Sequence, residues 1–240
     1  MAGAGPMRVI LMLLALVGAA PAMAADSASL AVLGFSPDGR RFAFEEYGRQ
    51  DGSGFPYASI YLIDTEKNEF ASPPVHVRID SENATIGAAR RQAAARARTM
   101  LAAVTEPGET LASQSIAQVT DEPDRLRFRL GTHLPNGEEP STLTLAEIPM
   151  GEANGDPVAG FRLTLTDKGE SRLIHEDRRL PARRSTARGY RLGEVIAFRS
   201  PRGSGQPGTD VLVVMVMVLR QGFEGTDVRH MAVTAPLPAR

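Results

Sequence analysis

Cysteine and tryptophan are both absent from the 240 residues, and the net charge is only −1 at pH 7. Without cysteine there can be no disulfide bond, no thiolate catalysis, no Cys-ligated zinc and no lipid-modified N-terminal cysteine. The near-neutral charge gives no reason to expect nucleic acid as a partner. Hydrophobic residues make up 42% and charged residues 23%, which is typical of a folded soluble protein and excludes a disordered or collagen-like chain.

Long apolar runs are also scarce, and the longest one lies near the N-terminus. Residues 9–20 (VILMLLALVGAA) follow Arg8, and Pro21 with the small residues Ala22 and Ala24 comes directly after them. This order of a positive charge, an apolar run and small residues is that of a secretory signal peptide. The run is shorter than the roughly 20 residues that a membrane-spanning helix needs.

We therefore expect residues 1–24 to be a Sec-type signal peptide that is cleaved after Ala24. Residues 25–240 would then form a single β-rich domain that is secreted or periplasmic. Residues 211–219 (VLVVMVMVL) form the strongest later apolar run, which suits a strand buried on both faces and leaves no transmembrane span after cleavage. The alternatives are an uncleaved N-terminal anchor and a translation start at Met7.

Glycine (23) and proline (17) are abundant, which predicts many turns and many short strands. Between Ala25 and the first expected helix, strands are predicted at residues 29–35, 40–47, 59–64 and 69–79, with a tight turn at Ser36-Pro37-Asp38-Gly39. This stretch, from Leu30 to Ile79, locally resembles one blade of a TolB-type, WD40-like propeller. A partial β-propeller-like arrangement is therefore the alternative fold, although a closed propeller needs four or more blades.

One helix is expected, from about Ser81 to Thr105. Asp80 or Ser81 would cap it and Glu82 would lie in its first turn, where the helix dipole favours an acid. Its apolar side is mostly alanine at helical spacing, which predicts close packing on a sheet. A helix lying on an anionic membrane is the alternative, but alanine buries little area there.

The remainder of the chain is again predicted to form strands, with turns at Asp167-Lys168-Gly169-Glu170 and Pro135-Asn136-Gly137 and loops at residues 151–157 and 202–208. The fold class expected is mainly β, with antiparallel meander or sandwich-like sheets and one α-helix. The strands predicted after the helix are residues 110–119, 125–130, 142–148, 160–166, 171–176, 191–199, 210–220 and 229–234.

Four segments carry a resemblance to a known family: LGFSPDG at residues 33–39, FAFEEYG at 42–48, QDGSGFPY at 50–57, and GFEG at 222–225 before Asp227 and Arg229. Together they are similar to a bacterial family of predicted secreted proteins of unknown function. The resemblance implies secretion and a shared fold, and it implies no activity.

Two groups of residues are candidates for binding. Six arginines within 14 residues, with no acid among them, could pair with phosphates or carboxylates of envelope material, or could simply belong to a solvated loop: Arg178, Arg179, Arg183, Arg184, Arg188 and Arg191. Acids and aromatics around the glycine-rich loop at residues 48–56, together with the C-terminal family segment, could form a joint ligand surface, or could only shape a turn and cover a sheet edge: Glu46, Tyr47, Asp51, Tyr57, Glu224, Asp227 and Arg229.

No catalytic residue, metal ligand or cofactor is predicted. The four histidines (His76, His133, His175 and His230) are scattered, and no zinc, nucleophile-elbow or phosphate-loop motif occurs. The expected function is a non-enzymatic binding or interaction module of the envelope, with an envelope protein or an anionic glycan as partner. The alternatives are a subunit of a larger β assembly and a hydrolase with a site assembled from separate strands, for which a cleft that gathers an acid with His175 or His230 would argue.

Overall fold

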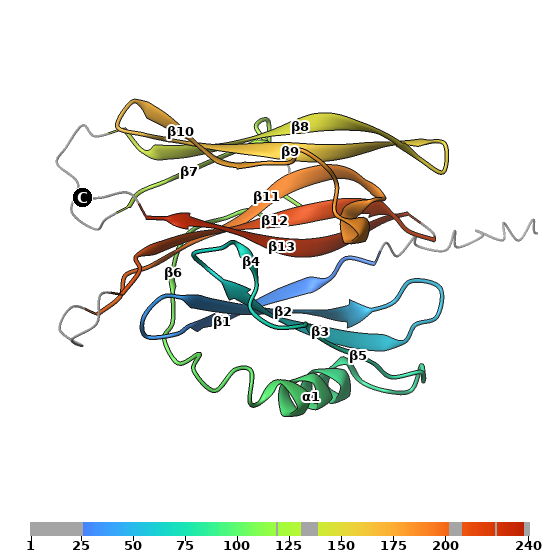
Figure 1. Ribbon diagram of the computed structural model, residues 1–240. Helices are drawn as coiled ribbons and strands as arrows, with labels where there is room; N and C mark the ends of the chain where they lie inside the picture. The colour runs from blue at the N-terminus through green and yellow to red at the C-terminus, as the bar shows by residue number, and fades with distance from the viewer. Residues whose placement is uncertain (1–25, 119, 131–138, 202–207, 224, 238–240) are drawn as a thin grey trace, which may run out of the picture.

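The structure, a computed structural model, describes residues 26–118, 120–130, 139–201, 208–223 and 225–237. Three antiparallel sheets lie on one another in layers, and one helix covers the free face of the lowest layer (Figure 1). We call these layers the N-terminal sheet, the central sheet and the outer sheet. The prediction of a mainly β, antiparallel, sandwich-like fold with a single helix is confirmed.

The N-terminal sheet is a meander that begins with the predicted tight turn. Ser36 donates its hydroxyl hydrogen to Asp38 (2.6 Å) and accepts the N–H of Arg41 (2.9 Å), while Gly39 takes φ = +72°. The predicted strand at residues 69–79 is split in two because Pro73 and Pro74 lack the N–H that a ladder requires. The strands are β1 (Ser29–Phe35), β2 (Arg41–Arg49), β3 (Pro56–Asp64), β4 (Glu69–Phe70) and β5 (Val75–Arg78).

The resemblance of this meander to a propeller blade does not extend to the whole molecule. A propeller arranges its sheets around a central axis. Here the N-terminal sheet lies face to face with the central sheet, and Phe35, Phe42 and Phe44 pack against Phe198 and Met215 in the layer between them (Figure 1). The propeller alternative is therefore not supported, and the layered arrangement is what positions the site described below.

The helix α1 (Ile86–Ala97) is shorter than the predicted span. Its N-cap is Thr85, whose hydroxyl accepts the N–H of Ala88 (3.1 Å), so the prediction of a cap at Asp80 or Ser81 is wrong and no acid lies in the first turn. Beyond the helix, Thr105 and Glu106 donate their N–H groups to the carbonyl of Phe35, which draws the chain onto β1.

The alanine side of α1 packs on the N-terminal sheet, as predicted. Ala89, Ala93 and Ala97 are fully buried against Ile60 and Val77, because small side chains allow a helix to approach a sheet closely. Arg91, Arg96 and Arg98 are exposed, whereas Arg90 reaches back to Glu45 of β2.

The central sheet is buried on both faces. Its strand order is β13-β12-β11-β6, and β12 carries the apolar run predicted to be doubly buried. Leu212, Val214 and Val216 face the outer sheet, and Val213 and Met215 face the N-terminal sheet, so that prediction is confirmed. The strands are β6 (Glu109–Ser113), β11 (Ala187–Phe198), β12 (Val211–Gln221) and β13 (Thr226–Pro236).

The outer sheet has the order β10-β9-β8-β7. The predicted turn at residues 167–170 joins β9 to β10, whereas the predicted loop at residues 151–157 is wrong: β8 and β9 continue through it to a tight turn at Asn154 (φ +55°) and Gly155 (φ +83°). The predicted turn at Pro135-Asn136-Gly137 lies outside the described residues. The strands are β7 (Arg125–Phe128), β8 (Ser141–Ala153), β9 (Asp156–Asp167) and β10 (Glu170–Glu176).

Candidate functional site

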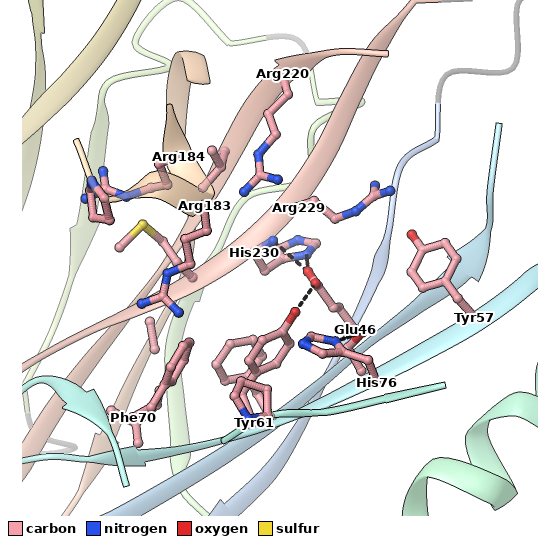
Figure 2. Close-up of a pocket in the computed structure, with 18 of the residues that line it drawn as sticks. Glu46, Tyr57, Tyr61, Phe70, His76, Arg183, Arg184, Arg220, Arg229 and His230 are labelled. Carbon is pink, nitrogen blue, oxygen red and sulfur yellow. Dashed lines mark hydrogen bonds and ion pairs between the residues drawn. The ribbon is translucent and has the colours of Figure 1, made fainter. Parts of the chain in front are cut away.

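A cleft of about 870 Å³ opens where the N-terminal sheet, the strands β12 and β13, and the segment between β10 and β11 meet. A short 3₁₀-helix, η1 (Ala182–Arg184), lies in that connecting segment. Figure 2 shows arginines from η1, β12 and β13 on one side, facing an acid and aromatic rings from β2, β3 and β4 on the other. The cleft is therefore built from segments that are far apart in the sequence.

Strand alternation explains which side chains of the N-terminal sheet reach the cleft. Tyr57, Ser59 and Tyr61 on β3 line it, while the residues between them, Ala58 and Ile60, pack against α1. On β2, Glu46 lines the cleft, whereas its neighbour Glu45 pairs with Arg90 of the helix (2.8 Å). The two glutamates thus lie on opposite faces, as the strand pattern predicts.

Glu46 is the buried acid at the centre of the cleft. Tyr61 donates its hydroxyl hydrogen to one carboxylate oxygen (2.5 Å), and the backbone N–H of His230 donates to the other (2.9 Å; Figure 2). Burial and the nearby Glu46 raise the pKa of Tyr61 far above its ordinary value, so the phenol keeps its proton. Burial, with help from Arg229, lowers the pKa of His230 to about 4, so that its imidazole is neutral at neutral pH.

Two arginines beside the cleft are held by acids of the protein itself. Arg184 forms a bidentate pair with Asp177 (2.5 and 2.6 Å), and both side chains are buried. Burial raises the pKa of Asp177, but hydrogen bonds from Arg184, His175 and the N–H of Phe161 outweigh it and hold the pKa well below its usual value. Asp177 is therefore an ionised structural anchor for η1.

The second paired arginine ties the start of the described chain to β13. Arg229 contacts the carboxylate of Asp26 (2.5 Å) and also donates to its backbone carbonyl (2.9 Å). Tyr57 donates its hydroxyl hydrogen to the same carboxylate (2.8 Å), and Arg229 lies over its ring. This contact joins residues 203 positions apart.

Arg183 and Arg220 also line the cleft, but neither forms an ion pair with any residue that the structure describes. The guanidinium carbon of Arg183 lies over the ring of Phe70, 3.9 Å from its centroid, and the Nε of Arg220 is buried without a hydrogen-bond partner. Burial lowers the pKa of both arginines. These two arginines therefore bring positive charge to the cleft without an acidic partner among the described residues.

The predicted arginine cluster is divided among different environments. Arg183 and Arg184 reach the cleft, and Arg188 pairs with Asp156 outside it. Of the other three, Arg178 and Arg179 are exposed and Arg191 is partly buried.

The predicted ligand residues are placed in three groups. Glu46, Tyr57 and Arg229 line the cleft, Tyr47 lies under Arg90 of the helix, and Glu224 is outside the described residues.

The third group is Asp51 with Asp227. It lies where the glycine-rich loop at residues 48–56 meets the C-terminal family segment, as the predicted joint surface requires. A Cβ added to Gly52 would lie 3.4 Å from the ring of Phe223, which is 81% exposed. Asp51 and Asp227 are close enough for the charge of Asp51 to raise the pKa of Asp227, although burial raises it more. Among the described residues, no group of acids and histidines is arranged to hold a metal ion.

Sequence reasoning missed Ser59, Tyr61, Phe70, His76 and Arg220. Ser59 and His76 face each other across β3 and β5, with Oγ and Nδ1 2.9 Å apart. For Ser59 and Tyr61, the alternation of side chains between the two faces of β3 was the available signal. Arg220 follows directly after the apolar run at residues 211–219 and is not among the predicted site residues.

Residues 43–235 match the model of a family described as "Predicted secreted protein (DUF2259)". The chain belongs to this family. No curated protein and no solved structure matches it. Membership in the family supports secretion, and no helix among the described residues is long and apolar enough to span a membrane. The family description carries no activity, so a function has to be inferred from the cleft.

Proposed function

We propose that the protein is a secreted or periplasmic envelope protein that binds a ligand in the cleft and does not transform it. The observation that carries the proposal is the cleft itself, because its volume of about 870 Å³ lies in the range of small-molecule sites. Polar groups with shifted pKa values converge there beside aromatic rings, as in ligand sites generally.

The edge of β13 supports the cleft, rather than strand addition, as the means of binding. Ala28 donates to the carbonyl of Val228, Glu46 accepts the N–H of His230, and Asn68 accepts the N–H of Thr234 (2.9 Å). An edge whose N–H and carbonyl groups already have hydrogen-bond partners is a poor template for a further strand.

Export through a cleaved signal peptide is part of the same proposal. Residues 1–24 would be removed after Ala24, and residues 25–240 would act as one domain. Asp26, the second residue of that mature chain, is only 4% exposed and is held by Arg229 and Tyr57. Mass determination of the N-terminal peptide of the exported protein tests this, and a first residue other than Ala25 would contradict it.

Binding in the cleft is tested with a ligand panel and a blocking variant. Isothermal titration calorimetry would compare a neutral oligosaccharide, an acidic oligosaccharide, an acidic peptide and inorganic phosphate. Ala232 lines the cleft, so Ala232→Phe should abolish binding of the active class. Leu173→Phe, at an exposed leucine of β10, adds the same ring outside the cleft and should leave binding unchanged. Binding that survives Ala232→Phe in a folded variant, or no binding by any class, would contradict the proposal.

A hydrolase is the second candidate, because the cleft gathers Glu46 with His230 and Asp177 with His175. The pair that could act as nucleophile and base, however, is Ser59 with His76. Ser59 Oγ would attack an ester carbonyl carbon and pass its proton to His76 Nδ1, which would return it to the departing alcohol oxygen. Water, deprotonated by His76, would then attack the carbonyl carbon of the acyl-serine. His76 would return this proton to Ser59 Oγ as the bond from that oxygen to the acyl carbon breaks and the acid leaves.

The hydrolase stands second because Ser59 is only 8% exposed and no described acid is hydrogen-bonded to His76. A fluorophosphonate probe tests it. Covalent labelling that is lost in Ser59→Ala and kept in Ser171→Ala, at an exposed serine, would favour the hydrolase. Absence of labelling would favour binding alone.

A further inference from the structure

This inference rests on the proposed function and names the chemistry of the ligand. Five arginines line the cleft, and one of them, Arg78, pairs with Asp80; the other four are Arg183, Arg184, Arg220 and Arg229. Asp177 and Asp26 satisfy two of these four, and the remaining two have no acidic partner in the described residues. Arg183 is exposed, whereas Arg220 is partly buried with its Nε fully buried. A partly buried charge without a partner is costly, so the position of Arg220 requires a compensating gain.

The positive charges also oppose one another. After burial, the largest effect on the pKa of Arg183 comes from Arg184, and Arg220 lowers it too. Arg229 lowers the pKa of Arg220 in the same way, although Glu46 and two tyrosines partly compensate. The arginines therefore share one field, and an anion placed between them would relieve the repulsion at several positions together.

The acids that line the cleft do not supply that anion. Both oxygens of Glu46 already accept hydrogen bonds, from Tyr61 and from the backbone of His230. Asp80 pairs with Arg78 at 2.7 Å. Glu69 is exposed and forms no ion pair with a described residue.

The stacking of Arg183 prepares it for a ligand. Its guanidinium carbon lies 3.9 Å from the centroid of the Phe70 ring, and the N–H groups of a guanidinium lie in its plane, along its edge. That edge is the part that matches a carboxylate or a phosphate with two parallel hydrogen bonds. Figure 2 shows Arg183 above Phe70 and Arg220 above His230, both on the side of the cleft that faces Glu46 and Tyr61.

We infer that Arg183 and Arg220 form a binding site for an oxyanion, a carboxylate or phosphate group carried by the ligand of the cleft. Glu46 is near enough to repel a second negative group of the ligand on that side of the cleft and so to weaken its binding. The neutral, hydroxyl-bearing part of the ligand would therefore lie toward Glu46, Ser59 and His76. A sugar with one acidic group combines one oxyanion with neutral hydroxyl groups in this way.

Calorimetry on the mature chain at low salt tests the inference with four probes: inorganic phosphate, sulfate, glucuronate and glucose. Arg183→Met and Arg220→Met keep the apolar stem and remove the donors. Each should weaken binding of the active oxyanion by about tenfold or more, as expected for hydrogen bonds to a charged group. Arg96→Met, at an exposed position of α1 on the far side of the N-terminal sheet, should leave affinity unchanged.

The probes separate the possible outcomes. Phosphate and sulfate binding without glucuronate would identify a tetrahedral oxyanion, and glucuronate alone a carboxylate; either supports the inference. No oxyanion binding, or equal losses in Arg96→Met, would overturn it. If a neutral ligand bound in the cleft, was blocked by Ala232→Phe and ignored both arginine variants, the proposed function would stand and this inference would fail.

Discussion

The two faces of the central sheet are closed in different ways. Toward the outer sheet, one continuous apolar cluster runs from Phe128 to Val218, and the charged pair at its border, Arg184 with Asp177, satisfies itself. Toward the N-terminal sheet, an aromatic cluster that includes Phe44 and Met215 fills part of the space between the two sheets. The cleft lies beyond the end of this cluster. The same strand, β12, contributes to both.

Arg184 and Arg220 differ in the same way, because among the described residues one has hydrogen-bond partners and the other lacks them. Arg184 has a bidentate acid and a tyrosine hydroxyl within 3.0 Å, so its burial stabilises the fold. Arg220 has a buried Nε with no partner and lies in the field of Arg229. Local rules of polar satisfaction are broken mainly at functional sites, where the cost is offset by binding. Four measurements test this contrast.

The largest effect is expected from Asp177→Ala. It would leave the guanidinium of Arg184 buried without an acid and would free the N–H of Phe161. Breaking a buried pair in this way costs about 3–5 kcal/mol of unfolding free energy. Urea denaturation measures the loss, and Asp156→Ala, which breaks the more exposed pair with Arg188, should cost about 1 kcal/mol or less. Similar losses in the two variants would contradict the assignment of Asp177 as a structural anchor.

The next effect is a dependence on pH. The pKa of His230 is lowered to about 4 in the folded protein, while an unfolded histidine has a pKa of about 6.5. Between these values the unfolded chain binds more protons, so stability must fall as the pH drops from about 6.5 to about 4, by up to about 3 kcal/mol. Denaturation at several pH values should show this slope reduced in His230→Gln. An unchanged slope would mean that other groups cause it.

The layered fold was largely predictable because its strongest signals are local. The run at residues 211–219 is apolar throughout, since it is buried on both faces, and Ser36–Gly39 carries its own hydrogen bonds. The sequence of the Asn154-Gly155 turn is typical of a hairpin, but the polar residues around it favoured a longer loop at residues 151–157. Thr85 was overlooked as the helix cap because Asp80 and Ser81 offered equivalent chemistry a few residues earlier.

The cleft was not predictable in the same way. Glu46, Arg183 and Arg220 come from three segments whose proximity depends on how the sheets stack. Nothing in their sequence neighbourhoods distinguishes Arg183, which is free of acids, from Arg184, which is held by one. Asp177 precedes both arginines by only a few residues, and the backbone path through η1 decides which of them it reaches.

A smaller effect should follow from Asp26→Asn. The amide keeps the shape of the side chain but removes the charge that faces Arg229 and Tyr57. Because Arg229 remains partly exposed to solvent, we expect a loss of about 2 kcal/mol, within the range for hydrogen bonds to charged groups. Affinity for the oxyanion should rise at the same time, because a third arginine is released. A stability loss without any gain in affinity would place Arg229 outside the shared field.

The smallest effect, and the only gain in stability, is expected from Arg220→Met in the protein without ligand. The substitution removes an uncompensated charge and keeps the methylene stem, so unfolding free energy should rise by up to about 1 kcal/mol, whereas Arg184→Met should lower it. Thermal unfolding with and without the oxyanion measures both sides of the argument. The unliganded variant should melt higher than the wild-type chain, and the same ligand concentration should raise its melting temperature less than that of the wild-type chain. If Arg220→Met were as destabilising as Arg184→Met, both arginines would serve the fold, and the contrast between the two faces of the central sheet would be wrong.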